Sequence, residues 1–193
     1  MQVRFSICIG MEVIDDGAGT VLARVSGILI HPDSGKVEGF FVRPLGGLDT
    51  QGSFVASIDI LTLGTCITVR GDDALCDPAD ILRLAQLLGD PRTVLGQHMR
   101  TQSGAAIGRC ADVQFDTKSM HLQWLFPKRW WRWGPPVSVK EIIEVRPEAI
   151  ILRDPAPLET VEAEQEEPTP YRAPHLADIP EPGVTLSQRN NVH

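Results

Sequence analysis

An internal repeat limits the folds open to this chain more than any other feature of its sequence. Residues 19–25 (GTVLARV) align with residues 104–110 (GAAIGRC), and residues 59–63 (DILTL) align with residues 141–145 (EIIEV). The further matches are Ile28 with Val113, Ile30 with Phe115, Val37 with Leu122, and residues 67–69 with the region 149–152. Because the matches keep their order and their apolar character, we expect two copies of one small unit.

Each copy has the pattern of short β-strands separated by turns. In the first copy, residues 3–9 and 21–30 favour strands, and HPDSG at 31–35 is a tight turn in which proline presets φ and glycine accepts a positive φ. Residues 37–42 return as the second strand of a hairpin, and a glycine-rich loop follows at 46–52. Strands this short protect their edges best by closing into a barrel. The sequence therefore predicts a mainly β fold of two tandem small β-barrels.

A short helix is expected between the two units. Asp77 can cap its first turn and Pro78 suits the first helical position. The apolar positions that follow have helical spacing, and they are Ile81, Leu84, Ala85 and Leu88. Gly89 is placed to end the helix. We therefore expect a first barrel at 1–76, a linker helix within 77–92 and a second barrel at 93–154.

The remaining segment, 155–193, has a different composition. It contains seven of the 15 prolines, seven acidic residues and two basic residues, so that most of the net charge of −7 lies in it. Large apolar residues are sparse there, and such a segment cannot bury enough surface to offset its ordering entropy. The sequence predicts a disordered acidic tail, which is either a solvating extension or a docking segment that folds on a partner.

Composition also bears on the compartment. No apolar run approaches the roughly 20 residues of a membrane helix, and the first residues lack the pattern of a signal peptide. The four cysteines, Cys8, Cys66, Cys76 and Cys110, show no C-x-x-C spacing and are expected to be buried free thiols rather than zinc ligands. We therefore expect a cytoplasmic protein without a transmembrane segment.

The residues of both copies resemble a known family. The sequence GMEV at 10–13 followed by 19–25, and the corresponding stretch 104–116, look like a PRC-barrel domain, as does the closing segment from 137 to 152. The resemblance covers roughly residues 5–153 as two copies. The family includes the cytoplasmic domain of the photosynthetic reaction-centre H subunit and the C-terminal domain of the ribosome maturation factor RimM. The resemblance implies a binding or assembly module and supplies no catalytic residues.

All four tryptophans of the chain lie within ten residues, in the sequence WLFPKRWWRW at 124–133. Trp124 and Phe126 alternate on the predicted hairpin strand and are expected to lie in the core. The repeat alignment places the residues after them in a loop whose counterpart in the first copy has no aromatic residue. The candidate partner-binding residues are Lys128, Arg129, Trp130, Trp131, Arg132 and Trp133.

Four interpretations of this segment stay open. The tryptophans can close the bottom of the barrel or pack between the two units. Aromatic residues with arginine are also typical anchors of protein interfaces, and tryptophan with basic residues suits a membrane surface. Aromatic stacking beside basic side chains can also hold single-stranded RNA, although the three basic residues of the segment are few for that purpose.

The sequence offers no pattern of a catalytic, metal or cofactor site. The histidines stand alone, the acidic pairs at 15–16 and 72–73 offer too few ligands for a metal, and no nucleophile elbow, zinc-protease or phosphate-loop motif is present. We therefore expect a non-catalytic binding or assembly adaptor that docks a protein partner or complex, without cofactor or metal. The alternative is an RNA- or ribosome-associated maturation module.

Overall fold

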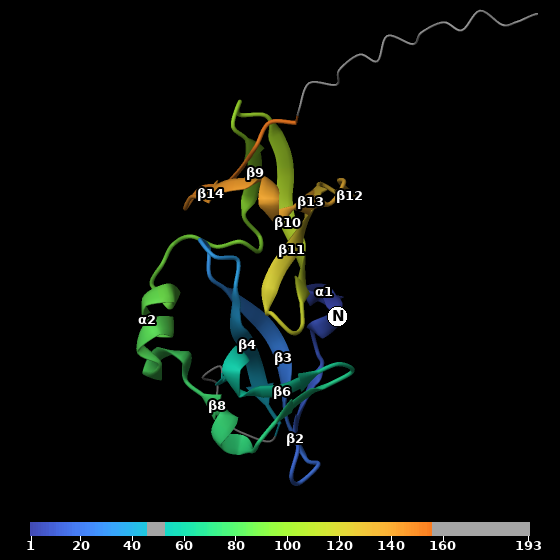
Figure 1. Cartoon of the computed structure of the whole chain (residues 1–193), viewed down its shortest axis with the longest axis vertical. Helices are drawn as coiled ribbons and strands as arrows, with labels where there is room; N and C mark the ends of the chain where they lie inside the picture. Colours follow the sequence, from blue (N-terminus) through green and yellow to red (C-terminus); the bar gives the residue numbers. More distant parts are fainter. Residues whose placement is uncertain (46–52, 156–193) are drawn as a thin grey trace, which may run out of the picture. The chain divides into compact units, whose positions relative to one another are not determined.

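The computed structural model describes residues 1–45 and 53–155, and it is mainly β. The strands form two sheets. Figure 1 draws the long hairpin of the first, residues 21–44, in shades of blue, and that of the second, residues 106–129, in yellow-green to yellow. The predicted glycine-rich loop at 46–52 lies outside the described residues, as does the predicted tail from residue 156 onward. Among the described residues, no helix is long and apolar enough to cross a membrane.

The two sheets repeat one strand order. The first consists, from edge to edge, of β6 (Ile60–Leu63), β7 (Ile67–Val69), β2 (Glu12–Asp15), β3 (Val21–Ile30), β4 (Val37–Pro44), β5 (Ser53–Ala56) and β8 (Leu75–Cys76). The second has the order β14 (Ile142–Val145), β15 (Ile150–Leu152), β9 (His98–Thr101), β10 (Ala106–Asp116), β11 (His121–Arg129) and β12 (Arg132–Trp133). Two further strands of this sheet lie beside that path, β1 (Gln2–Arg4) paired with β10 and β13 (Val137–Ser138) paired with β11, so the order shared by the two sheets runs from β6 to β4 and from β14 to β11. In each, a parallel pair, β2 with β7 or β9 with β15, joins the long hairpin to the closing strands.

The register places the repeated residues in equivalent positions. Val25 pairs with Val42 just before a β-bulge in the first sheet, and Cys110 pairs with Pro127 just before a bulge in the second. Short 3₁₀ turns, Ser57–Asp59 and Val139–Glu141, precede β6 and β14. The alignment of 59–63 with 141–145 therefore corresponds to a turn and strand with the same pairing partners.

The first residues do not form the strand expected over 3–9. β1 (Gln2–Arg4) pairs antiparallel with β10 of the second sheet, with Val3 opposite Phe115, and α1 (Phe5–Cys8) follows as one helical turn. The helix forms despite the β-favouring residues because tertiary contacts override local propensity. It buries Phe5 and Cys8 while the side chain of Asp112 accepts hydrogen bonds from Ser6.

The two sheets meet through the turns of their long hairpins. The amide of Val37 donates to the carbonyl of Met120 at 2.7 Å, and the amide of Leu122 donates to the carbonyl of Gly35 at 2.9 Å. Lys36 and His121 lie opposite each other between these two hydrogen bonds, as an isolated antiparallel β-bridge. Side chains from both sheets belong to one continuous core, in which the rings of Phe40 and Phe115 lie 6.0 Å apart. The two halves therefore share buried surface rather than forming separate cores.

The linker forms two short helices instead of one. A 3₁₀ turn at Pro78–Asp80, capped by the Asp77 carboxylate, is followed by α2 (Leu82–Leu88), and Ile81 between them has extended backbone angles. Only Leu84 of α2 is fully buried, and it packs with Phe54 and Ala56 of the first sheet. The break at Ile81 changes the chain direction, and α2 then lies against this sheet. Arg83 of α2 also forms an ion pair with the buried Glu38 at 3.5 Å.

Candidate functional site

The predicted tryptophan loop is the tip of a β-hairpin. Lys128 pairs with Trp133 and Arg129 with Arg132, so that Trp130 and Trp131 form a two-residue turn. Trp130 has a φ of 58°, and Trp131 does not share this left-handed conformation. A positive φ in a two-residue hairpin turn is normally taken by glycine, asparagine or aspartate. The chain thus holds a bulky aromatic residue where its backbone is strained.

The turn tryptophans face solvent. Trp130 is 81%, Trp131 74% and Trp133 54% exposed, and the rings of Trp130 and Trp131 meet edge to face at 5.8 Å. The interpretation that they close the barrel or pack between the units is therefore wrong for these three residues. Exposed tryptophans at the tip of a short hairpin are available to a partner.

Trp124 was expected in the core, and this prediction is wrong. Leu122, Leu125 and Pro127 of β11 face the core, and a bulge against Gln114 and Phe115 places Leu122 and Leu125 on the same side. Trp124 and Phe126 do alternate on one face of β11, as the sequence predicts, but that face is the outer one. Trp124 is 38% exposed.

Basic side chains from neighbouring strands extend this outer face. One row across the sheet joins His98 to Arg109, Arg109 to Lys128, and Lys128 to Trp133. Arg100 follows on the same side of β9 because alternate residues of a strand share a face. These strands border a hollow of about 360 Å³, whose lining includes both arginines and Trp130 and has no carboxylate.

Arg4 of β1 completes the face. Its guanidinium lies 3.6 Å from the centroid of the Phe126 ring and 5.7 Å from that of Trp133, and the Lys128 ammonium lies 5.2 Å from the Trp133 centroid. Such cation–π contacts orient the aromatic rings. One face of the second sheet thus combines basic and aromatic side chains, namely Arg4, Arg100, Arg109, Phe126, Lys128 and Trp133.

Asp112 anchors the segment that carries Arg4. Its carboxylate is only 2% exposed and accepts hydrogen bonds from the Ser6 amide at 3.0 Å, the Ser6 hydroxyl at 2.6 Å and the Val113 amide at 2.9 Å. The Arg4 Nε lies 3.6 Å from the same carboxylate. The buried charge is therefore paired and hydrogen-bonded, as a buried carboxylate requires.

Sequence reasoning found the hairpin residues 128–133 but missed Arg4, Arg100 and Arg109. Arg109 had a signal, because the predicted hairpin register places it opposite Lys128. Arg4 had none, since its pairing with the second sheet spans more than a hundred residues. The structure brings all the predicted site residues together at one hairpin, beside three basic side chains from elsewhere in the chain.

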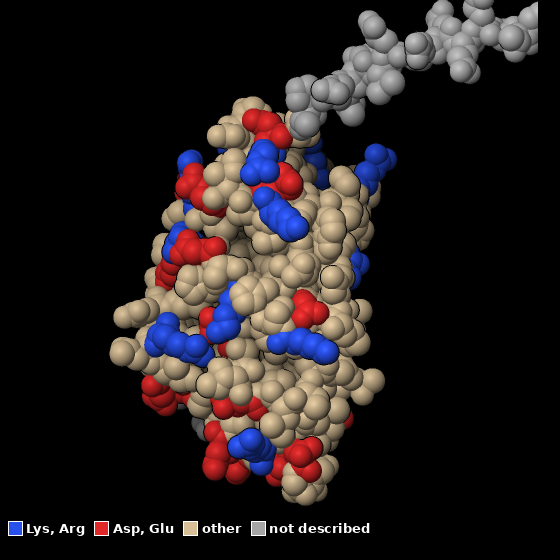
Figure 2. All heavy atoms as spheres, viewed as in Figure 1, with Lys and Arg blue, Asp and Glu red and all other residues tan. Residues whose placement is uncertain are grey.

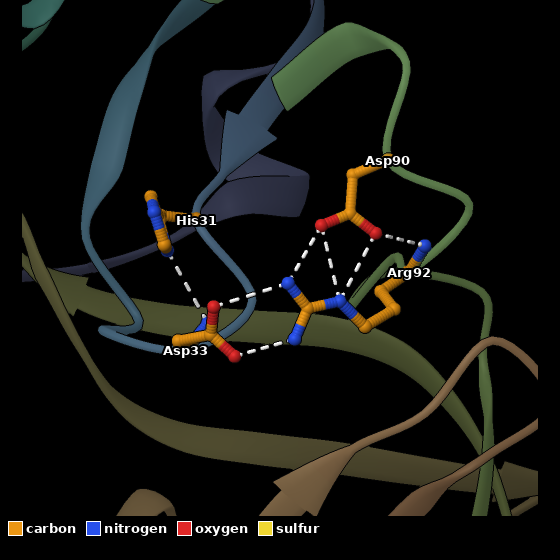
Figure 3. A network of polar contacts seen from close by, with 4 residues as sticks. All are labelled: His31, Asp33, Asp90 and Arg92. Carbon is orange, nitrogen blue, oxygen red and sulfur yellow. Dashed lines mark hydrogen bonds and ion pairs between the residues drawn. The ribbon is translucent and has the colours of Figure 1, made fainter. Parts of the chain in front are cut away.

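The opposite charges are mixed over other parts of the surface. Figure 2 shows Lys and Arg interspersed with Asp and Glu on the face turned to the reader. A network of this kind joins Arg92 to Asp33, with N–O distances of 2.5 and 3.1 Å, and to Asp90 at 2.7 Å (Figure 3). The hydrogen bond from the Arg92 side chain lowers the pKa of Asp90. Both carboxylates already have a partner, so this network fastens the linker to the turn at 31–35.

The histidines and paired acids remain apart. The ring of His31 accepts from the Asp33 amide, His98 lies 3.4 Å from the Arg109 guanidinium, and His121 contacts the Ser119 carbonyl. Within 1–45 and 53–155, no three His, Cys, Asp or Glu side chains lie close enough together to hold a metal ion.

The cysteines are expected to differ in reactivity. Burial, assisted by the negative charge of Asp112, raises the pKa of Cys8 to about 11 and that of Cys110 to about 12. Relative to an ordinary thiol, the reactive thiolate fraction at neutral pH falls by about a hundredfold or more. The prediction of buried thiols is confirmed for Cys8 and Cys110 but wrong for Cys66 and Cys76, which are partly exposed. In timed iodoacetamide labelling read by mass spectrometry, Cys66 and Cys76 should be modified first in the folded protein. In denaturant, all four cysteines should be modified at similar rates. Early labelling of Cys110 would contradict its burial.

Glycine at the strained turn position should stabilise the hairpin. Trp130→Gly and Trp131→Gly both remove the contact between the two rings, but only the first relieves a positive φ. We expect W130G to exceed W131G in free energy of unfolding by about 1 kcal/mol, measured by urea denaturation followed by circular dichroism. Equal stability of the two variants would show that the turn is unstrained.

Comparison with known proteins bears on the first sheet. No curated protein matches the chain. Residues 2–78, which include β1, α1 and every strand of the first sheet, match the family described as PRC-barrel domain.

Proposed function

We propose that this chain is a cytoplasmic, non-catalytic binding adaptor of two PRC-like β-barrels, which docks a protein partner through the hairpin at 128–133. The family match over residues 2–78 supports the first barrel. The second sheet supports the second barrel, because it repeats the strand order and the parallel pairing of the first. Members of a fold share architecture rather than activity, so the role itself rests on the surface features of this chain.

The observation that carries the proposal is the exposure of Trp130 and Trp131 on a strained turn. Exposed apolar surface and backbone strain both cost free energy in the isolated protein. Tryptophan and arginine are also the residues that most often dominate binding energy at protein interfaces. The cost is explained if the pair becomes buried against a partner.

The charge of the neighbouring surface indicates the chemistry of that partner. Arg4, Arg100, Arg109 and Lys128 lie around the aromatic rings, and the hollow between their strands has no carboxylate in its lining. A partner surface that combines an apolar pocket with acidic residues would complement both features. We therefore assign the partner an acidic rim around a pocket for tryptophan.

The test compares two matched sets of substitutions in the full chain. Trp130, Trp131 and Trp133 are replaced by alanine in one variant; Ile58 and Leu82, which are 71% and 78% exposed elsewhere, are replaced in the other. After cross-linking in cells, co-purified proteins are quantified by mass spectrometry. We expect the tryptophan variant to lose at least one partner about tenfold or more and the control to retain it. Equal recovery with an intact fold would refute the proposal.

The basic row favours a second candidate, binding of single-stranded RNA. Arg109 and Lys128 lie opposite each other beside the rings of Phe126 and Trp133, and cations beside stacking surfaces are the arrangement that such proteins use. This candidate predicts that an oligouridine probe binds the full chain with an affinity that falls steeply as salt rises. Fluorescence anisotropy measures this, and absence of binding at low salt removes the candidate.

A further inference from the structure

The two long hairpins differ at one edge. In the second sheet, the end of β10 is covered by β1, with Gln2 opposite Asp116, Val3 opposite Phe115 and Arg4 opposite Gln114. The equivalent end of β3 pairs with β4 on one side only, because the backbone bonds that β3 makes to β2 and to the residues before it end at Val25. Among the described residues, no strand and no backbone hydrogen bond covers the other side of Gly27–Ile30.

The backbone groups of β3 point into this open edge. The amide of His31 bonds to Lys36 on the β4 side, and successive residues of a strand alternate in direction. Ile28 and Ile30 therefore turn their N–H and C=O groups away from β4. The backbone of β10 alternates in the same way. The amide of Thr117, two residues beyond Phe115, donates to the Met1 carbonyl at 2.7 Å, so the backbone groups of Phe115, the counterpart of Ile30, also point toward β1.

A hollow of about 390 Å³ lies beside this edge. It runs along Ser26–Ile30 and is bounded by Phe5, by Leu87 and Leu88 of α2, and by residues 92–95 of the linker. More of its lining is apolar than polar. The charged side chains at its rim, Asp90 and Arg92, bind each other. The hollow thus combines unpaired backbone groups with an apolar wall, which are the two requirements of strand addition.

We propose that β3 accepts an extended segment of a protein partner as an added antiparallel strand along Gly27–Ile30. The chain's own β1 shows what fits, because it occupies the equivalent place on β10. Val3 is 7% exposed and faces the core beside Phe115, whereas Gln2 is exposed. The added strand accordingly has an apolar residue opposite Ile30, flanked by polar residues.

This surface lies on the other sheet from the hairpin at 128–133, so the inference stands apart from the function proposed above. An exposed strand edge otherwise invites uncontrolled pairing between copies. Here the hollow is narrowed by α2 and the linker, which favours a single extended chain over the edge of a second folded sheet.

The test uses displayed random peptides, selected on the full chain. We expect enriched peptides that carry an apolar residue between polar ones. A synthetic peptide of this kind should slow hydrogen exchange at the amides of Ile28 and Ile30, as read by nuclear magnetic resonance. N-methylation of the peptide amide that bonds to Ile30 should weaken binding about tenfold, whereas N-methylation of the next amide should change it less than about twofold.

Three results would overturn the inference. They are the absence of enriched peptides, protection at Trp130 and Arg132 without protection of Ile28, and equal effects of the two N-methylations. As a further control, the peptide should bind equally well to the chain in which Trp130, Trp131 and Trp133 are alanine. This control distinguishes failure of strand addition from failure of the proposed function, because the hairpin substitutions leave the β3 edge unchanged.

Discussion

Gly39→Ala is expected to lower the free energy of unfolding by about 3 kcal/mol or more. A Cβ at this position would lie 2.2 Å from the carbonyl oxygen of Val55 and 2.4 Å from the ring of Phe54. The first of these atoms is backbone of the paired strand β5, so it cannot rotate away. Gly39 also has a φ of 157°, which disfavours other residues. Urea denaturation followed by tryptophan fluorescence measures the change.

The matched control is Gly64→Ala. Gly64 lies in the turn between β6 and β7 and has no atom within 4 Å of its Cβ direction. We expect its substitution to change the free energy of unfolding by less than about 0.5 kcal/mol. Equal free energies of unfolding for G39A and G64A would contradict the close approach of β4 and β5 at Gly39.

Asp112→Ala is expected to cost about 3 kcal/mol and to release the first residues of the chain. The substitution removes a buried charged acceptor and leaves the amide and hydroxyl of Ser6 without their partner. Arg4 loses its contact with the same carboxylate. Because these residues hold β1 and α1 on β10, hydrogen exchange over residues 2–8 should accelerate more than exchange over the first sheet.

Ser6→Ala provides the graded control for this result. It removes one hydroxyl and leaves the Ser6 amide, so its cost should be about 1 kcal/mol. A loss in D112A no larger than that in S6A would mean that the remaining contacts of the carboxylate contribute little. Uniform acceleration of exchange over both sheets in D112A would contradict a local anchoring role.

The sequence predicted the long hairpins well because their signals are local or repeated. The alternation of apolar residues and the HPDSG turn determine the pairing of 21–30 with 37–42, and the aligned positions of the second half have the same register. The place of β1 could not be predicted. The strand propensity of Gln2–Arg4 is the same whichever sheet it joins, and only packing against β10 decides between them.

Only the part of the candidate site that has a local sequence signal could be predicted. The clustering of tryptophans marked the segment, but the sequence left open whether their side chains pack or are exposed. The pairing of Lys128 with Trp133 and the exposure of the turn come from the structure alone. The outward direction of Trp124 depends on the filling of the core by Leu122 and Leu125, which alternation alone does not determine. The approach of Arg4 to Phe126 depends on a strand from the start of the chain.

The two hydrogen bonds between the hairpin turns are reciprocal. In one, Val37 of the first half donates to Met120 of the second, and in the other, Leu122 of the second half donates to Gly35 of the first. Such reciprocal contacts are those of a two-fold homodimer, here contained in a single chain. A homodimer of one half would carry every surface twice. In this chain the halves have diverged, since residues 44–52 have no aromatic residue where the second half has its hairpin. Each chain therefore carries one tryptophan hairpin, and under the proposed function it offers a partner one such docking site rather than two.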